Sequence, residues 1–95
     1  MIKTFVCAKT KRLFETGKPE GFLRPIENVA KRKLAMLHFA SRLSDLGMAW
    51  GNRLEALKGD RKGQYSIRVN DRYRVCFRFH EDEGNAYNVE TTDYH

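Results

Sequence analysis

The spacing of hydrophobic residues changes near Gly51, and this change decides what the chain can fold into. Over residues 25–46 apolar side chains recur every three or four positions, which predicts one long amphipathic helix that Pro25 opens. Beyond Gly51 apolar and polar residues alternate instead, which is typical of strands that bury one face. We therefore expect an α+β fold in which the helices pack on one face of a mainly antiparallel sheet.

Turn residues place the other elements. A strand over 2–7 and a short helix over 8–15, closed by Gly17, precede a loop over 17–25. Strands are predicted at 53–57, 65–69, 72–79 and 86–91, with tight turns at Asn70-Asp71 and at 81–84. The expected order is β-α-α-β-β-β-β, in one domain over residues 1–95, because a chain of 95 residues has room for one core. The cations of the long helix are expected on its solvent side: Lys31, Arg32, Lys33 and Arg42.

The two cysteines, Cys7 and Cys76, lie inside apolar runs and form no CxxC or Cys/His pattern. We therefore expect free thiols, no structural metal ion and no cofactor. The N-terminal residues lack the apolar stretch of a signal peptide, and no segment reaches transmembrane length. The sequence predicts a cytoplasmic protein that does not contact a membrane.

Positive charge is concentrated in one part of the chain. The formal net charge is +6; lysine and arginine crowd residues 58–78, whereas residues 79–95 contain neither. The alternation puts apolar side chains such as Val75 and Phe77 on one face of the sheet. On the opposite face it puts Arg68, Arg72, Arg74 and Arg78. We expect this face to be exposed and almost purely cationic, which favours a polyanion such as RNA as its ligand.

Several motifs resemble those of one family. Residues 51–67 read GNRLEALKGDRKGQYSI, residues 69–77 read VNDRYRVCF, and the chain ends in Asp93-Tyr94-His95. Together with FETG at 14–17 and RKLAML at 32–37, these segments resemble the HigB-type toxins of the RelE/ParE superfamily, also called plasmid maintenance killer proteins. The resemblance extends over almost the whole chain, with the motifs in order.

The resemblance implies a small RelE-like fold of the microbial-RNase type and the role of toxin in a type II toxin–antitoxin system. It implies a ribosome-dependent endoribonuclease that cleaves mRNA codons in the ribosomal A site and so inhibits translation and growth. The implied partners are the ribosome, mRNA and a HigA-type helix-turn-helix antitoxin. Operator DNA would be contacted only through the complex with that antitoxin.

Cleavage of RNA without a metal ion needs a deprotonated 2′-hydroxyl, a protonated 5′-oxygen leaving group and stabilisation of charge on the phosphate. Asp93 and His95 lie two positions apart, so they project to the same side of an extended tail and reach one phosphate together. We predict that Asp93 and His95 are catalytic, with Lys58 and Arg74 as charge stabilisers. The predicted RNA- or ribosome-binding residues are Arg61, Lys62, Arg68, Arg72, Arg78, Tyr94 and Glu55.

Glu55 departs from the family pattern, because some members carry an active-site histidine in this motif, where the present chain has Glu55 and Ala56. A carboxylate among arginines is expected to stay ionised and to orient a cation, and a role as general base stays open. Two other functions remain open: a ParE-like toxin that inhibits DNA gyrase, and a non-catalytic RNA-binding module. Trp50 is expected to cover the edge of the core rather than to stack on a base.

Overall fold

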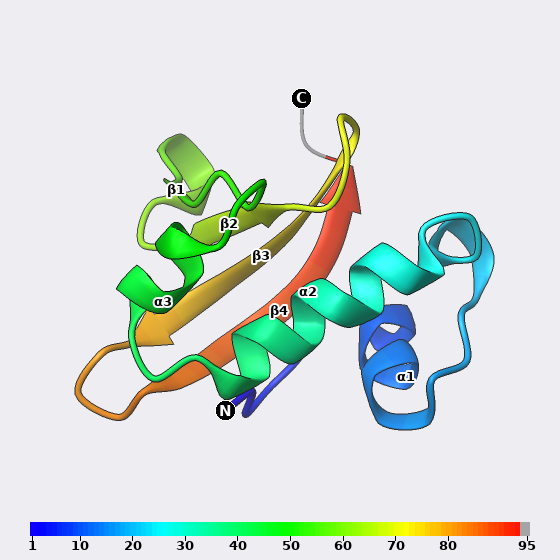
Figure 1. The fold of residues 1–95 in the computed structure, drawn as a ribbon, viewed down its shortest axis with the longest axis horizontal. Helices are drawn as coiled ribbons and strands as arrows, with labels where there is room; N and C mark the ends of the chain where they lie inside the picture. Colours follow the sequence, from blue (N-terminus) through cyan, green and yellow to red (C-terminus); the bar gives the residue numbers. More distant parts are fainter. Residues whose placement is uncertain (94–95) are drawn as a thin grey trace.

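The computed structural model describes residues 1–93, with helices in the first half of the chain and strands in the second (Figure 1). This order confirms the predicted α+β class. The elements are α1 (Ala8–Thr16), the 3₁₀ helix η1 (Gly21–Leu23), α2 (Glu27–Phe39), α3 (Leu43–Met48), β1 (Glu55–Ala56), the 3₁₀ helix η2 (Gly59–Arg61), β2 (Tyr65–Arg68), β3 (Tyr73–His80) and β4 (Asn85–Asp93).

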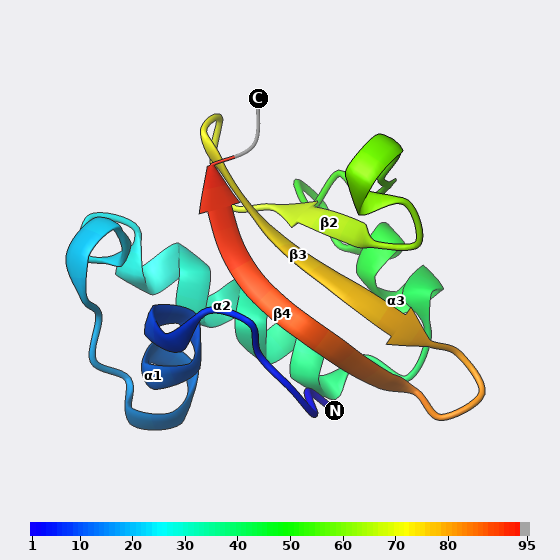
Figure 2. The ribbon, with the colours of Figure 1, turned by 180° about the vertical axis from the view of Figure 1, so that it is seen from behind.

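The strands form one antiparallel sheet in the order β1-β2-β3-β4. The predicted turn between β2 and β3 is present: Asn70 Oδ1 accepts hydrogen bonds from the backbone N–H groups of Arg72 and Tyr73, at 2.9 and 2.7 Å. β3 and β4 are the long, twisted strands of the sheet (Figure 2). Their register shifts between Cys76 and Arg78, a bulge that bends both strands.

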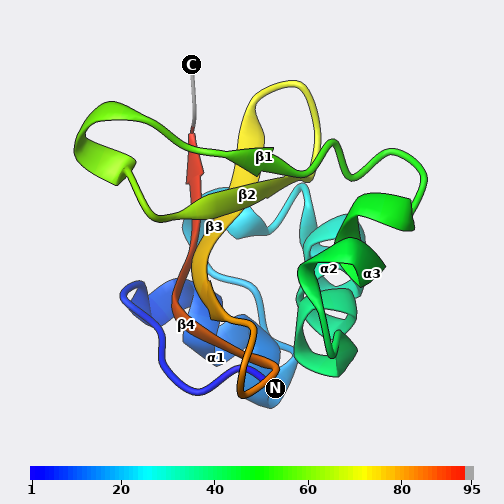
Figure 3. The ribbon, with the colours of Figure 1, turned by 90° about the vertical axis from the view of Figure 1, so that its left-hand side faces the viewer.

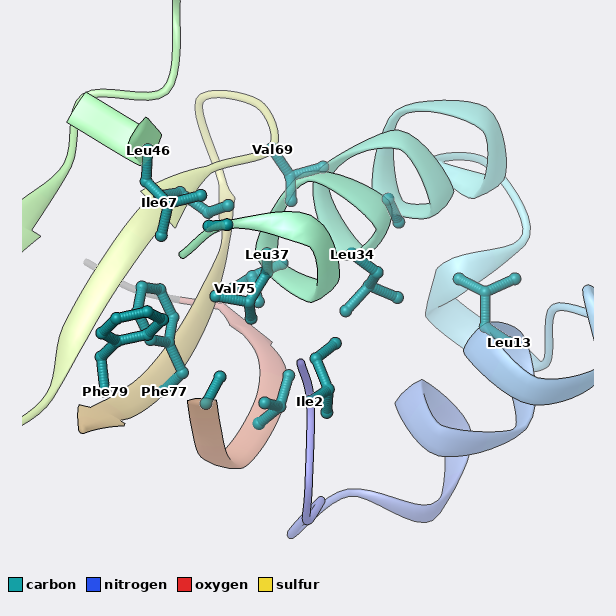
Figure 4. Packing of buried hydrophobic residues seen from close by; sticks show 14 of the residues in the cluster. Ile2, Leu13, Leu34, Leu37, Leu46, Ile67, Val69, Val75, Phe77 and Phe79 are labelled. Atoms are coloured by element: carbon teal, nitrogen blue, oxygen red, sulfur yellow. The ribbon is translucent and has the colours of Figure 1, made fainter. Parts of the chain in front are cut away.

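The core lies between the helices and one face of the sheet. Leu34 and Leu37 of α2 are fully buried against a cluster that contains Val75 and Phe77 of β3 and Ile67 of β2 (Figure 4). Figure 3 shows α2 and α3 beside each other on the same side of the strands. The predicted packing of the helices on the apolar face is therefore confirmed, and the opposite face is left for function.

The predicted strand over 2–7 is wrong. The N-terminal segment forms only two isolated parallel bridges with β4, Ile2 with Ala86 and Phe5 with Val89. Between them the Thr4 hydroxyl, not a backbone carbonyl, accepts the hydrogen bond from the Asn88 backbone N–H, at 2.8 Å. This side-chain bond interrupts the ladder, so the segment lies along β4 without becoming a full strand.

The single long helix is also wrong, because the structure divides it into α2 and α3. The chain is extended at Ala40, and helix resumes at Leu43. Asp45 causes the restart: its Oδ2 accepts hydrogen bonds from the backbone N–H groups of Ser41 and Arg42, at 2.9 and 3.1 Å. Within residues 1–93 no helix combines the length and apolar character needed to cross a membrane.

Lys33 does not lie on the solvent side of α2 as predicted. It is 6% exposed, and its Nζ donates to Oδ1 of Asn52, which is fully buried. The Asn52 side chain also donates to the Leu46 carbonyl at 3.0 Å, and the Asn52 carbonyl accepts from the Arg68 N–H at 2.6 Å. Asn52 thereby fastens the segment after α3 to α2 and to the edge of the sheet.

Candidate functional site

The face of the sheet opposite the helices carries the candidate site. Strand register aligns Glu55 with Ser66, Ser66 with Cys76, and Cys76 with Glu90, so these four residues form one row across all four strands. Because directly paired residues in an antiparallel sheet point to the same side, the two carboxylates share this face with the predicted arginines. The prediction that the face is almost purely cationic is therefore wrong.

Arg61 reaches over the middle of this face from η2. Its Nη1 donates to Gln64 Oε1 at 3.1 Å and its Nη2 to Glu90 Oε1 at 3.4 Å. Because Glu90 lies on β4, the Arg61 side chain crosses β3 above Cys76. Cys76 is fully buried, and this burial raises the pKa of its thiol. The loop that contains η2 is thus fastened to the far strand of the sheet.

Arg74 is on the predicted face but is buried, not exposed as we expected, with 11% of its side chain accessible. Its Nε donates to Ser66 Oγ at 2.6 Å, and its Nη2 donates to the carbonyls of Arg53 and Ser66 at 2.5 and 3.4 Å. These bonds fix the guanidinium plane. Within residues 1–93 Nη1 makes no hydrogen bond, and its neighbour is Glu55 Oε1 at 3.9 Å.

Glu55 stands beside this fixed guanidinium with about half of its side chain exposed (53%). At 3.9 Å from Arg74 Nη1 the carboxylate is close enough to attract the cation without holding it in a hydrogen bond. The role of Glu55 as a residue that orients a cation stays a prediction. Within residues 1–93 the two N–H donors of Arg74 Nη1 have no hydrogen-bond acceptor.

Asp93 ends β4 in register with Tyr73, where β3 begins. Its Oδ2 accepts a hydrogen bond from Arg72 Nε at 2.8 Å, and this ion pair raises the pKa of Arg72. The other two residues predicted for the tail, Tyr94 and His95, lie outside the described residues. On the described part of the chain, the end of β4 thus brings Asp93 next to Arg72.

Three predicted cations have no carboxylate partner within residues 1–93: Lys58, Lys62 and Arg78. Lys58 and Lys62 flank η2 and are exposed. Arg78 lies against Gly63 so closely that a Cβ atom on Gly63 would be 2.6 Å from Arg78 Nη1. With φ at +91°, Gly63 also has a backbone conformation that favours glycine. The loop over 58–63 and Arg78 therefore form the cationic end of the face.

Sequence reasoning missed Ser66, Gln64 and Glu90 as members of the site. Their role depends on register, which aligns Ser66 and Glu90 with Cys76, and periodicity alone does not give register. Trp50 was predicted wrongly: its side chain is 97% exposed and covers no part of the core. The described residues contain no cluster of acidic, histidine and cysteine side chains that could hold a metal ion.

Comparison with known proteins decides the family. The family model described as "RelE-like toxin of type II toxin-antitoxin system HigB" matches residues 3–95. The chain belongs to this HigB-like family. As a HigB-like toxin of a type II system, it has a cognate antitoxin. The resemblance expected from the sequence motifs is thereby confirmed.

Two relatives of this HigB-like toxin show how far the likeness extends. Toxin HigB-1 of Vibrio cholerae serotype O1 is 50% identical over 54 residues, which cover 57% of this chain and 57% of that protein. Endoribonuclease HigB of Proteus vulgaris is 35% identical over 97 positions, which cover both chains completely. The second alignment includes all the residues of the candidate site.

Proposed function

We propose that this HigB-like toxin is an endoribonuclease that cleaves mRNA in the ribosomal A site. The observation that carries the proposal is the fixed guanidinium of Arg74, whose Nη1 lies next to Glu55 and makes no hydrogen bond within residues 1–93. A cation held in place before the reaction stabilises developing negative charge without the cost of reorganisation. The full-length similarity to a protein named Endoribonuclease HigB supports the same activity.

In the proposed reaction the 2′-hydroxyl of one nucleotide attacks the adjacent phosphorus. Its proton passes to a base, a 2′,3′-cyclic phosphate forms, and the bond to the 5′-oxygen breaks. That oxygen takes up a proton and leaves as a 5′-hydroxyl. We assign the two proton transfers to Asp93 and His95, and charge stabilisation to Lys58 and Arg74. The proposed mechanism uses no metal ion and no cofactor.

The remaining predicted residues would hold the strand and the ribosome. Lys58 and Lys62, with Arg78, give the face a cationic end that attracts phosphates. Arg61, Arg68 and Arg72 are already paired with Glu90, Asp71 and Asp93, so a phosphate would have to exchange with a carboxylate there. The Arg68–Asp71 and Arg72–Asp93 pairs are exposed and contribute little to stability, so an exchange costs little there. An exchange at Arg61, which is partly buried and fastens η2 to β4, costs more. Tyr94 would stack on a base or bond to a phosphate.

The ribosome would supply the alignment that this small domain lacks. A 95-residue domain has only one exposed sheet face with which to hold a flexible strand for in-line attack. Alignment of reacting groups contributes as much as about 7–11 kcal/mol to catalysis, and mRNA on the ribosome is already held in an extended path. We therefore propose that cleavage depends on translation and takes place in the cytoplasm.

A helix-turn-helix antitoxin of the HigA type is the proposed partner. The cationic end of the open face, with Lys58, Lys62 and Arg78, would attract an acidic segment of such a protein. Binding there would compete with RNA. Contact with operator DNA would come only through the antitoxin.

The test is cleavage of a defined mRNA by the purified chain, with and without translating ribosomes, with the new 5′ ends mapped by primer extension. We expect cuts inside reading frames only when ribosomes translate. Deletion of His95 should abolish them, and Lys58→Ala should reduce them by about 10²-fold. Lys11→Ala is the matched control, because it removes the same charge from the exposed side of α1 and should leave cleavage unchanged.

Three outcomes would contradict the proposal. Equal cutting of free transcript would remove the role of the ribosome. Full toxicity of the His95 deletion at equal expression would favour a module that binds RNA without cleaving it. Inhibition of DNA supercoiling without RNA cleavage would favour the gyrase-directed alternative.

A further inference from the structure

We propose that Trp50, with Arg53 and Arg68, forms a stacking site for one nucleobase of single-stranded RNA and its phosphate. The three side chains line a surface recess of about 300 Å³ together with Gly51. This inference rests on the proposed function, since it assumes that the chain binds mRNA. It adds a contact outside the residues predicted for catalysis.

The exposure of Trp50 is the first observation. The indole is 97% exposed, so almost none of its apolar surface is buried in the fold. An aromatic ring so exposed contributes almost nothing to folding and is available to a ligand. Every base has a flat π face, so an exposed indole stacks on bases without requiring a particular sequence.

The second observation is that the exposed ring is carried by a fixed segment. Asn52, two positions away, is fully buried and bonded through its side chain to Lys33 and Leu46. Its backbone N–H also donates to the Ala49 carbonyl at 3.2 Å, and its carbonyl accepts from the Arg68 N–H. The backbone that presents Trp50 is therefore held in place before any ligand binds, which lowers the entropic cost of binding.

The third observation is the charge of the recess. Arg53 and Arg68 supply two cations, and the nearby acidic residue is Asp71, which pairs with Arg68. The Asp71 carboxylate is fully exposed; Arg68, and to a lesser extent Arg53, hold its pKa below the ordinary value. An exposed ion pair of this kind is weak, so a phosphate can replace Asp71 at Arg68. The Trp50 ring would stack on a nucleobase, and the two neighbouring arginines would bind the phosphate of the same nucleotide.

The position of the recess connects it with the candidate site. Arg68 is the register partner of Arg74, whose fixed guanidinium faces the open side of the sheet. The carbonyl of Arg53, which also lines the recess, accepts a hydrogen bond from Arg74 Nη2. A base stacked on Trp50 would therefore belong to a nucleotide close to the one that contacts Arg74. We expect Trp50 to influence where along the message the enzyme cuts.

The experiment uses the fluorescence of Trp50, the only tryptophan of the chain. The probe is hexaadenylate with 2′-O-methyl groups, which cannot be cleaved through its 2′-hydroxyls. We expect it to quench the emission and to protect the indole from acrylamide. An abasic strand of equal length should bind more weakly and give little protection. By filter binding, Trp50→Ala should weaken the affinity for hexaadenylate by about fivefold or more, and Trp50→Phe should lose less.

Matched variants separate stacking from other effects. Phe39→Ala removes another strongly exposed aromatic ring (81%) that does not line the recess, and it should leave RNA affinity unchanged. Arg53→Asn removes a cation but suits the positive φ of 46° at this position, and it should weaken binding more at low salt than at high salt. Trp50→Ala should unfold at the same urea concentration as the parent chain, since the indole is exposed.

The proposal is overturned if hexaadenylate binds without protecting the indole, or if the abasic strand protects it equally. If the antitoxin protects the indole and hexaadenylate does not, the recess belongs to a protein partner, and the proposal is overturned as well. Ribosome-dependent cleavage separates this failure from failure of the proposed function. If the parent chain cleaves mRNA, and Trp50→Ala cuts the same positions at the same rate, only the stacking site is wrong. If the parent chain does not cleave, the proposed function is wrong.

Discussion

Replacement of Asn52 by alanine should destabilise the fold by about 3–5 kcal/mol. Two buried hydrogen bonds would be lost: the one from Asn52 Nδ2 to the Leu46 carbonyl, at 3.0 Å, and the one that Oδ1 accepts from Lys33 Nζ. Leaving a buried neutral acceptor without a partner costs about 1–3 kcal/mol, and leaving a buried charged donor costs more. Because Lys33 is only 6% exposed, water cannot fully replace the lost acceptor.

The same substitution should have a characteristic pH dependence. Burial, and then repulsion by Arg32 and Arg68, lowers the pKa of Lys33 from its ordinary value of 10.5. Between the lowered value and 10.5 the unfolded chain binds more protons than the folded one, so stability rises with pH in this window. Without the Asn52 oxygen the pKa of Lys33 should fall further. The destabilisation caused by Asn52→Ala should therefore decrease as the pH rises from 7 toward 10.

The free energy of unfolding of both chains is measured by urea denaturation at pH 7 and pH 10, followed by far-UV circular dichroism. Asn28→Ala is the matched control, because Asn28 is exposed on α2 and its replacement should change the free energy of unfolding by less than about 0.5 kcal/mol. A loss below about 1 kcal/mol for Asn52→Ala at pH 7 would refute the reasoning. So would a loss that is the same at pH 7 and pH 10.

Three further predictions concern the core, the cationic loop and the buried thiol. Leu37→Ala should cost about 2–5 kcal/mol in urea denaturation, because it leaves a cavity in the cluster under the sheet; an unchanged midpoint would contradict the packing. Gly63→Ala should lower the free energy of unfolding by about 1–3 kcal/mol. The loss should exceed that of Gly59→Ala, because both glycines have a positive φ but only Gly63 lies against Arg78. Iodoacetamide at pH 8 should label one cysteine of the native chain, Cys7, by mass spectrometry. Arg61→Ala should make Cys76 reactive as well, and two labels on the native chain would contradict the covering role of Arg61.

Periodicity predicted the fold class and the buried face of the sheet, since both follow from which side chains can share a core. The break in the long helix was not predictable in this way, because the apolar spacing continues across Ala40 to Leu46. The break depends on Asp45, whose carboxylate accepts two backbone N–H groups that a continuous helix would use differently. The prediction of a strand over 2–7 was wrong for a similar reason, because a side chain, the Thr4 hydroxyl, replaces a backbone acceptor.

For the candidate site, the sequence predicted which cations share a face but not which of them water reaches. Arg74 is buried because Ser66 and the carbonyl of Arg53 surround it, and both come from other parts of the chain. The prediction for Trp50 was wrong in the opposite direction, because its hydrophobic character suggested burial whereas the residue is exposed. Alternation assigns a side chain to one face, whereas its exposure depends on what folds over that face. The roles assigned to Asp93 and His95 stay predictions.

The attachment of the N-terminal segment to β4 has a consequence for synthesis. Ile2 and Phe5 pair with Ala86 and Val89, and the Thr91 N–H donates to Thr10 Oγ1 across 81 positions of sequence. A growing chain thus has no partner for its first residues until β4 has left the ribosome. The contacts that close the fold at its N-terminal end therefore form late in folding. A nascent chain that lacks β4 therefore leaves both its N-terminal segment and the outer edge of β3 unpaired.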